Sequence, residues 1–78
     1  MEKYKNLSTN SSVTHYEIGD DFILVKFQDK MVYRYTHIMP GIMHVNKMKD
    51  CAKAGFGLNS YINKYVKKDY ADKYQAFI

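Results

Sequence analysis

The spacing of apolar residues changes once along this chain, near Pro40, and that change constrains the fold more than any other feature. Before Pro40, apolar and polar residues alternate, which is typical of strands that bury one face. After it, apolar residues recur every three or four positions, as they do on one face of a helix. A chain of 78 residues forms one small core and has no room for a second domain. We therefore expect one domain in which strands come first and helices follow.

Three segments of the first half have the composition of strands, namely Val13–Ile18, Phe22–Phe27 and Met31–Thr36. Short turns at residues 19–21 and 28–30 separate them, because Gly and Asp are frequent turn residues. Strands joined by short turns pair with their neighbours in antiparallel fashion. These segments predict a three-stranded antiparallel meander.

The turn between the second and third strands decides which face of the sheet carries Tyr33 and Tyr35. A two-residue turn over 29–30 requires left-handed backbone at both positions, which a lysine disfavours. A three-residue turn over 28–30 requires only one left-handed residue, and it places Val25 opposite Tyr33. We prefer this second register, in which both tyrosines face the helices. In the alternative register they stand on the open face of the sheet.

The second half predicts two or three helices. The first begins after Pro40-Gly41 and ends before Gly55, since proline favours helix starts and glycine favours helix ends. The second has an uninterrupted helical stripe, formed by Leu58, Tyr61, Ile62, Tyr65 and Val66. A similar stripe continues through Tyr70, Tyr74, Phe77 and Ile78, either in the same helix or in a third helix capped by Asp69.

The expected fold class is therefore α+β, with the element order βββαα and the helices packed on one face of the meander. Residues 1–11 are expected to form a polar, flexible lead-in, and residues 12–78 the single domain. The first 14 residues lack the apolar region of a signal peptide, and no apolar run is long enough to cross a membrane. We expect a cytoplasmic protein with no membrane association.

Composition and motifs argue against catalysis. The chain has one cysteine, and its histidines are too dispersed to form a recognisable metal-ligand pattern. It contains neither a Gly-rich phosphate loop nor a nucleophile and base at a recognisable spacing. We expect a protein that is not an enzyme and that uses no cofactor or metal.

An ordered set of residues connects the chain to a known family. Leu24-Val25-Lys26-Phe27 and a turn precede Tyr33-Arg34-Tyr35, and Pro40, Ala52-Lys53-Ala54-Gly55, Asn59, Ile62 and Tyr65 follow it. From about Ser11 to Tyr65 the chain resembles the KTSC domain, a small domain found at the C-terminus of some lysyl-tRNA synthetases and also free-standing. The family usually has a small hydroxyl residue where Ala54 stands, and often glycine where Lys30 stands. The synthetase context of the family implies RNA binding.

The residues themselves suggest a phosphate-bearing ligand. The chain carries a net charge of +4, and Arg34 is its single arginine. Two aromatic residues at positions i and i+2 with cations beside them suit base stacking on a sheet. The candidate binding residues on the strands are Tyr33, Tyr35, Lys26 and Arg34. Together they predict a non-catalytic module that binds RNA or a nucleotide.

Further candidates lie in the second half of the chain. Asn59 and Ser60 lie at the start of the segment with the strongest helical stripe, where they either cap the helix or assist an anion at its first amides. Lys64 belongs to a lysine run on the polar side of the last helical segment, which also holds Lys67, Lys68 and Lys73. That run is either a solvated face or a surface that follows phosphates.

A second function class remains open. On the preferred register the outer face of the sheet carries Leu24 and Val32 beside Lys26 and Arg34. Such a mixed patch suits self-association or the binding of a partner protein. A small free-standing domain of this kind is also consistent with an accessory protein of a mobile element that captures a host factor or a nucleotide.

Overall fold

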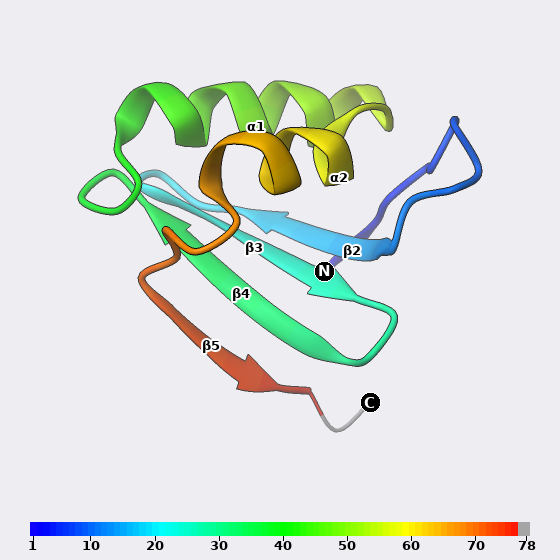
Figure 1. Cartoon of the computed structure of the whole chain (residues 1–78), viewed down its shortest axis with the longest axis horizontal. Coiled ribbons are helices and arrows are strands. Elements are labelled where there is room, and N and C mark those ends of the chain that lie inside the picture. The colour runs from blue at the N-terminus through cyan, green and yellow to red at the C-terminus, as the bar shows by residue number, and fades with distance from the viewer. Residues whose placement is uncertain (77–78) are drawn as a thin grey trace.

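One antiparallel sheet forms the lower layer in Figure 1, and helices cover one of its faces. This computed structural model describes residues 1–76 of the chain. The sheet has five strands in the order of the sequence, β1 (Glu2–Lys3), β2 (Val13–Ile18), β3 (Phe22–Phe27), β4 (Met31–Thr36) and β5 (Asp72–Gln75). The helices are α1 (Ile42–Ala54), α2 (Leu58–Tyr61) and the π-helical turn η1 (Ile62–Val66), which continues directly from α2. The α+β class is confirmed, with two more strands than the sequence predicts.

The register between β3 and β4 follows from the turn at residues 28–30. Lys30 is left-handed, with φ of 68°, and its N–H donates to the Phe27 carbonyl at 2.9 Å. Val25 consequently lies opposite Tyr33. Because alternate residues of a strand share a face, Tyr33 and Tyr35 both point toward the helices. The three-residue turn and the preferred register are confirmed.

The core lies between the helix-facing side of the sheet and the two helices. Alternate residues of the strands and apolar residues three or four positions apart on the helices build it. Strands β3 and β4 and helices α1 and α2–η1 all contribute. The fully buried members include Ile23, Val25, Tyr35, Val45, Met48, Leu58 and Val66. As predicted, α1 ends at a left-handed Gly55, whose N–H donates to the Ala52 and Cys51 carbonyls.

The N-terminal segment, expected to be a flexible lead-in over 1–11, is instead packed onto the domain. β1 pairs with β2, and the Tyr4 N–H donates to the Thr14 carbonyl at 2.9 Å. The Tyr4 side chain is only 3% exposed, and its hydroxyl accepts a hydrogen bond from the Leu58 N–H at 3.2 Å. One buried aromatic residue thus ties a polar segment to the helix layer.

The segment expected to extend the last helix is a strand. After η1 the Asp69 N–H donates to the Val66 carbonyl, and the chain then turns back to the sheet. β5 pairs with β4, and the Ala71 N–H donates to the Arg34 carbonyl at 2.7 Å. This pairing supplies hydrogen bonds to a β4 edge that a third helix would have left open. The predicted stripe positions Phe77 and Ile78 lie outside the described residues.

Candidate ligand-binding cavity

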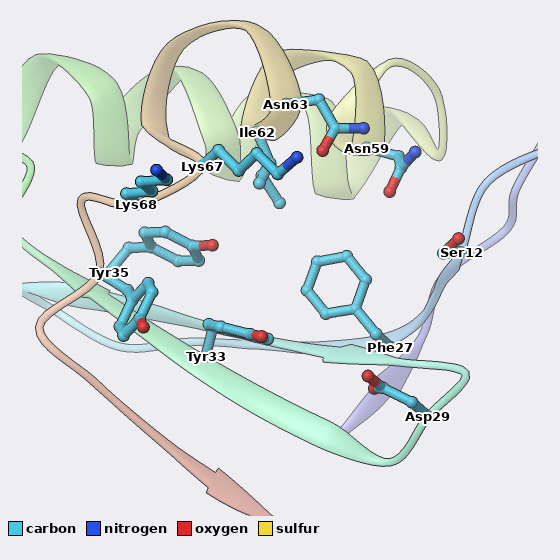
Figure 2. A pocket seen from close by; sticks show the side chains of 11 residues that line it. Ser12, Phe27, Asp29, Tyr33, Tyr35, Asn59, Ile62, Asn63, Lys67 and Lys68 are labelled. Atoms are coloured by element: carbon cyan, nitrogen blue, oxygen red, sulfur yellow. The ribbon is translucent and has the colours of Figure 1, made fainter.

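A cavity of about 470 Å³ opens between the helix-facing side of the sheet and the α2–η1 helix (Figure 2). Strands β3 and β4 and the turn between them line one side. The α2–η1 helix and the connection to β5 line the other. The residues that line it are Ser12, Phe27, Asp29, Tyr33, Tyr35, Asn59, Ile62, Asn63, Lys67, Lys68 and Tyr70.

Aromatic rings form the wall on the sheet side. The rings of Phe27 and Tyr33 meet edge to face, with centroids 5.4 Å apart. Tyr70, which follows η1, packs on Tyr33 in the same way at 4.9 Å. Edge-to-face contacts are a favoured geometry for aromatic pairs, and they hold these rings in fixed orientations. The sheet side of the cavity is therefore a firm aromatic surface.

A lysine of β5, Lys73, stands at the border of this aromatic wall. Lys73 lies opposite Tyr33 in the β4–β5 pairing. Its Nζ lies 5.8 Å from the centroid of the Tyr33 ring and 5.6 Å from that of Tyr70, within cation–π range. The aromatic cluster thus has a positive charge beside it.

The helix side of the cavity is polar and basic. Asn59, Asn63 and Lys67 are four residues apart, which places them on one face of the α2–η1 helix. Lys68 follows at the end of the same helix. Both lysines are exposed, and neither forms an ion pair with another residue in the described part of the chain. Their charges are available to a ligand.

The two ends of the cavity differ in charge. Figure 2 shows Lys68 and Tyr35 toward one end, and Asp29 and Ser12 toward the other. The Asp29 carboxylate is exposed and accepts a hydrogen bond from the Met31 N–H at 3.0 Å. A ligand that carries a negative group at one end is therefore expected to place that group beside Lys68 and away from Asp29.

Tyr35 is the most deeply buried polar residue of the cavity wall, at 1% exposed. Burial raises the pKa of its phenol well above the ordinary value, and the neighbouring Tyr33 and Tyr70 raise it further. At physiological pH the phenol is neutral, so its hydroxyl keeps the proton with which it donates a hydrogen bond.

Three of the residues singled out from the sequence meet at this cavity, namely Tyr33, Tyr35 and Asn59. Asn59 does not cap the helix as one interpretation expected. The residue before α2 is a left-handed Gly57 without a side-chain cap, and the first helical N–H bonds to Tyr4 instead. Ser60 does not cap it either, and lines a smaller hollow beside Tyr4 and Gly57.

The cationic candidates lie elsewhere. Lys26 and Arg34 are on the outer face of the sheet, because they alternate with the residues that face the helices. The Arg34 guanidinium binds Asp72 of β5 with two hydrogen bonds, Nε to Oδ1 at 2.8 Å and Nη2 to Oδ2 at 3.0 Å. The Lys64 Nζ lies 5.2 Å from the centroid of the Tyr65 ring, away from the cavity.

The Arg34–Asp72 pair joins the last two strands, but we expect it to add little stability. The two side chains are 45% and 53% exposed, so water and salt screen the attraction. Replacing Arg34 by alanine should lower the free energy of unfolding by no more than about 1 kcal/mol. Denaturant unfolding measures this effect, with Asp72→Ala expected to give a similar value. A loss of several kcal/mol would show that the β4–β5 pairing depends on this ion pair.

Sequence reasoning did not single out Phe27, Asn63 or Tyr70 as site residues, and it treated Lys67 and Lys68 only as part of a lysine run. One signal was present, since Asn63 and Lys67 continue the four-residue spacing that starts at Asn59. Whether these residues line the cavity depends on which face of the helix lies over the sheet. That orientation is set by tertiary contacts, which a sequence pattern does not show.

Comparison of the chain with protein-family models, with curated proteins and with solved structures gives no match. Within residues 1–76, no three His, Cys, Asp or Glu side chains are grouped so that they could hold a metal ion. Every helix in that range is too short or too polar to span a bilayer. Because one fold serves many functions, any assignment has to come from the chemistry of the cavity.

Proposed function

We propose that this chain is a non-catalytic binding module whose cavity holds a phosphate-bearing ligand with an aromatic base, as in a nucleotide or RNA. The supporting observation is that the same cavity is lined by an aromatic wall and by two lysines that form no ion pair with any residue of 1–76. The proposal keeps Tyr33, Tyr35 and Asn59 as binding residues. It replaces Arg34 and Lys26 by Lys67 and Lys68.

Each part of the cavity suits one part of such a ligand. The aromatic rings of Phe27 and Tyr33 offer apolar faces and edges to a base. The amides of Asn59 and Asn63 both donate and accept, as recognition of a base edge requires. Lysine ammonium groups bind phosphate. A volume of about 470 Å³ lies within the usual range for small-molecule sites.

We propose binding rather than catalysis because of what the cavity offers for proton transfer. Among its described lining residues, Asp29 is the sole carboxylate, and one of its oxygens already accepts the Met31 N–H. The Tyr33-x-Tyr35 pair that carries the resemblance to the KTSC domain lines the cavity, so the resemblance and the proposed ligand rest on the same residues. Nucleotides and RNA are cytoplasmic, and we propose that the protein acts there.

A panel of ligands tests the proposal. Nucleoside mono- and diphosphates, cyclic nucleotides and short single-stranded RNA are added to the protein at two salt concentrations, and thermal unfolding and titration calorimetry are recorded. A ligand at 100 times its Kd stabilises the folded state by about 2.7 kcal/mol. For a domain of this size that corresponds to a rise in Tm of roughly 10 °C or more. No heat of binding and no Tm shift with any member at millimolar concentration would refute the proposal.

The outer face of the sheet supports a second candidate, self-association. Leu24, Val32 and Tyr74 line a broad hollow of about 860 Å³ there, on the side opposite the helices. Tyr74 is 46% exposed, which is high for a large aromatic side chain beside apolar neighbours. Sedimentation at micromolar concentrations measures this directly. If the protein sediments only as a monomer, this candidate is excluded for copies of the same chain.

A further inference from the structure

Building on the proposed function, we infer that the cavity selects a free nucleotide with a terminal phosphate. The Tyr35 hydroxyl and the lysines Lys67 and Lys68 bind this phosphate together. The supporting observation is one hydroxyl that the fold leaves without a partner among the described residues.

The Tyr35 hydroxyl forms no hydrogen bond with any residue in the range 1–76. Within that range, the fully enclosed polar side-chain atoms that lack a partner are His15 Nδ1 and His37 Nε2. Tyr35 Oη is not among them although the residue is 99% buried, so the oxygen retains a small exposed area, and Tyr35 borders the cavity. Because this hydroxyl has no protein partner among the described residues and borders the cavity, its proton is available to a ligand atom that accepts a hydrogen bond there.

The surroundings of Tyr35 indicate which acceptor it meets. Lys68 lies at the same end of the cavity in Figure 2, and the Lys67 side chain extends from the helix toward the middle of the cavity. A hydroxyl donor and two ammonium groups together favour an anionic oxygen acceptor. Asp29 lies toward the opposite end and repels an anion there. The phosphate therefore binds at the Tyr35 end, and the base extends toward Phe27 and Asn59.

The charge at this end matches a phosphate monoester better than a diester. A monoester carries a charge of about −1.5 to −2 at pH 7, which balances two lysines. A phosphodiester inside an RNA strand carries a single charge, and the strand continues on both sides of it. Burial keeps the Tyr35 phenol protonated, as its raised pKa indicates, so it donates to the doubly charged form throughout the physiological range.

The test compares three forms of each nucleoside by titration calorimetry, namely the 5′-monophosphate, the unphosphorylated nucleoside and the 3′,5′-cyclic phosphate. The wild type should bind the monophosphate at least about tenfold more tightly than the other two, because charged acceptors form stronger hydrogen bonds. Its affinity for the monophosphate should also fall as the pH drops through about 6, where the second phosphate oxygen becomes protonated.

The decisive variant is Tyr35→Phe, which removes one oxygen and keeps the ring. We expect it to bind the monophosphate about tenfold more weakly, and to bind the nucleoside as the wild type does. Its Tm without ligand should be unchanged or slightly higher, since the lost hydroxyl has no partner among the described residues. Tyr65→Phe is the matched control, because Tyr65 is 50% exposed and lies outside the cavity lining. It should bind all three forms like the wild type.

The outcomes separate this inference from the function on which it rests. If nothing in the panel binds, the proposed function itself fails. If nucleotides bind but Tyr35→Phe binds the monophosphate as tightly as the wild type, the function stands and this inference is overturned. Equal affinity for the cyclic phosphate, or tighter binding of an RNA strand without a terminal phosphate, overturns it as well.

Discussion

Replacing Lys67 and Lys68 together by alanine is expected to weaken the binding of a nucleoside 5′-monophosphate by about 100-fold. Each ammonium group contributes a hydrogen bond to a charged oxygen, and such a bond is worth about 1.5–3 kcal/mol, the lower end of which is roughly tenfold in affinity for each lysine. Both side chains are exposed, so their loss should leave the fold intact. Titration calorimetry at constant ionic strength measures the effect, and thermal unfolding verifies that the variant is folded.

The matched control for this variant is the Lys53→Ala, Lys64→Ala double substitution. It removes the same net charge from exposed lysines that lie outside the cavity lining. If general attraction between a basic protein and an anion caused the binding, both double variants would lose affinity equally. A specific site predicts a change of about twofold or less in the control. An equal loss in both would remove the two cavity lysines from the proposed site.

Replacing Tyr4 by alanine is expected to cost about 3–5 kcal/mol of the free energy of unfolding, as is usual for a large buried aromatic residue. Tyr4 is only 3% exposed, and it connects the N-terminal segment to the helix layer. The total stability of a domain is about 5–15 kcal/mol, and small domains are marginally stable, so this variant should lose a large share of its stability. Denaturant unfolding followed by circular dichroism measures the loss.

Two further variants divide the effect of Tyr4 into its parts. Tyr4→Phe keeps the ring but leaves the buried Leu58 N–H without its acceptor, at a cost of about 1–3 kcal/mol. Leu7→Ala changes a residue of the same segment that is 64% exposed, and it should shift stability by about 0.5 kcal/mol at most. If Tyr4→Ala were no more harmful than Leu7→Ala, the N-terminal segment would not belong to the cooperative unit.

The central part of the fold was predictable because its determinants are local. The bounds of β2, β3 and β4 follow from alternation and turn residues, and the β3–β4 register follows from the single left-handed conformation that Lys30 adopts. Gly55 similarly marks the end of α1 at the expected position. Each of these features depends on residues that are close together in the sequence, so a short stretch of the chain is enough to predict it.

The two outer strands were not predictable in this way. β1 has two residues, and β5 follows a helical stripe whose tyrosine spacing also fits a helix. Both strands form because the neighbouring strand has an edge with free hydrogen-bonding groups, which is a property of the assembled sheet. The bulge in β2, where the register shifts between Val13 and His15, was not predicted either. It places Val13 in the core beside Tyr16, although strict alternation puts these two residues on opposite faces.

The candidate site was predictable only in part, for a related reason. The preferred register placed Tyr33 and Tyr35 under the helices, and the structure confirms that placement. Their cationic neighbours, however, come from the end of a helix some thirty residues later in the chain, where Lys67 and Lys68 lie. Proximity in sequence favoured Arg34, which stands between the two tyrosines but points to the other side of the sheet. Tertiary packing, which a linear pattern does not show, decides which cations accompany the aromatic wall.

The most direct test of the account is a two-dimensional ¹H–¹⁵N NMR titration of the protein with a nucleoside 5′-monophosphate. We predict that the largest shifts occur at backbone amides around the cavity, including those of Tyr33, Asn63 and Lys67. Amides of residues whose side chains lie on the outer face and away from the cavity, such as Leu24, should move little. Shifts centred on the outer face, or no shifts at millimolar ligand, would contradict the proposal that this cavity is the nucleotide-binding site.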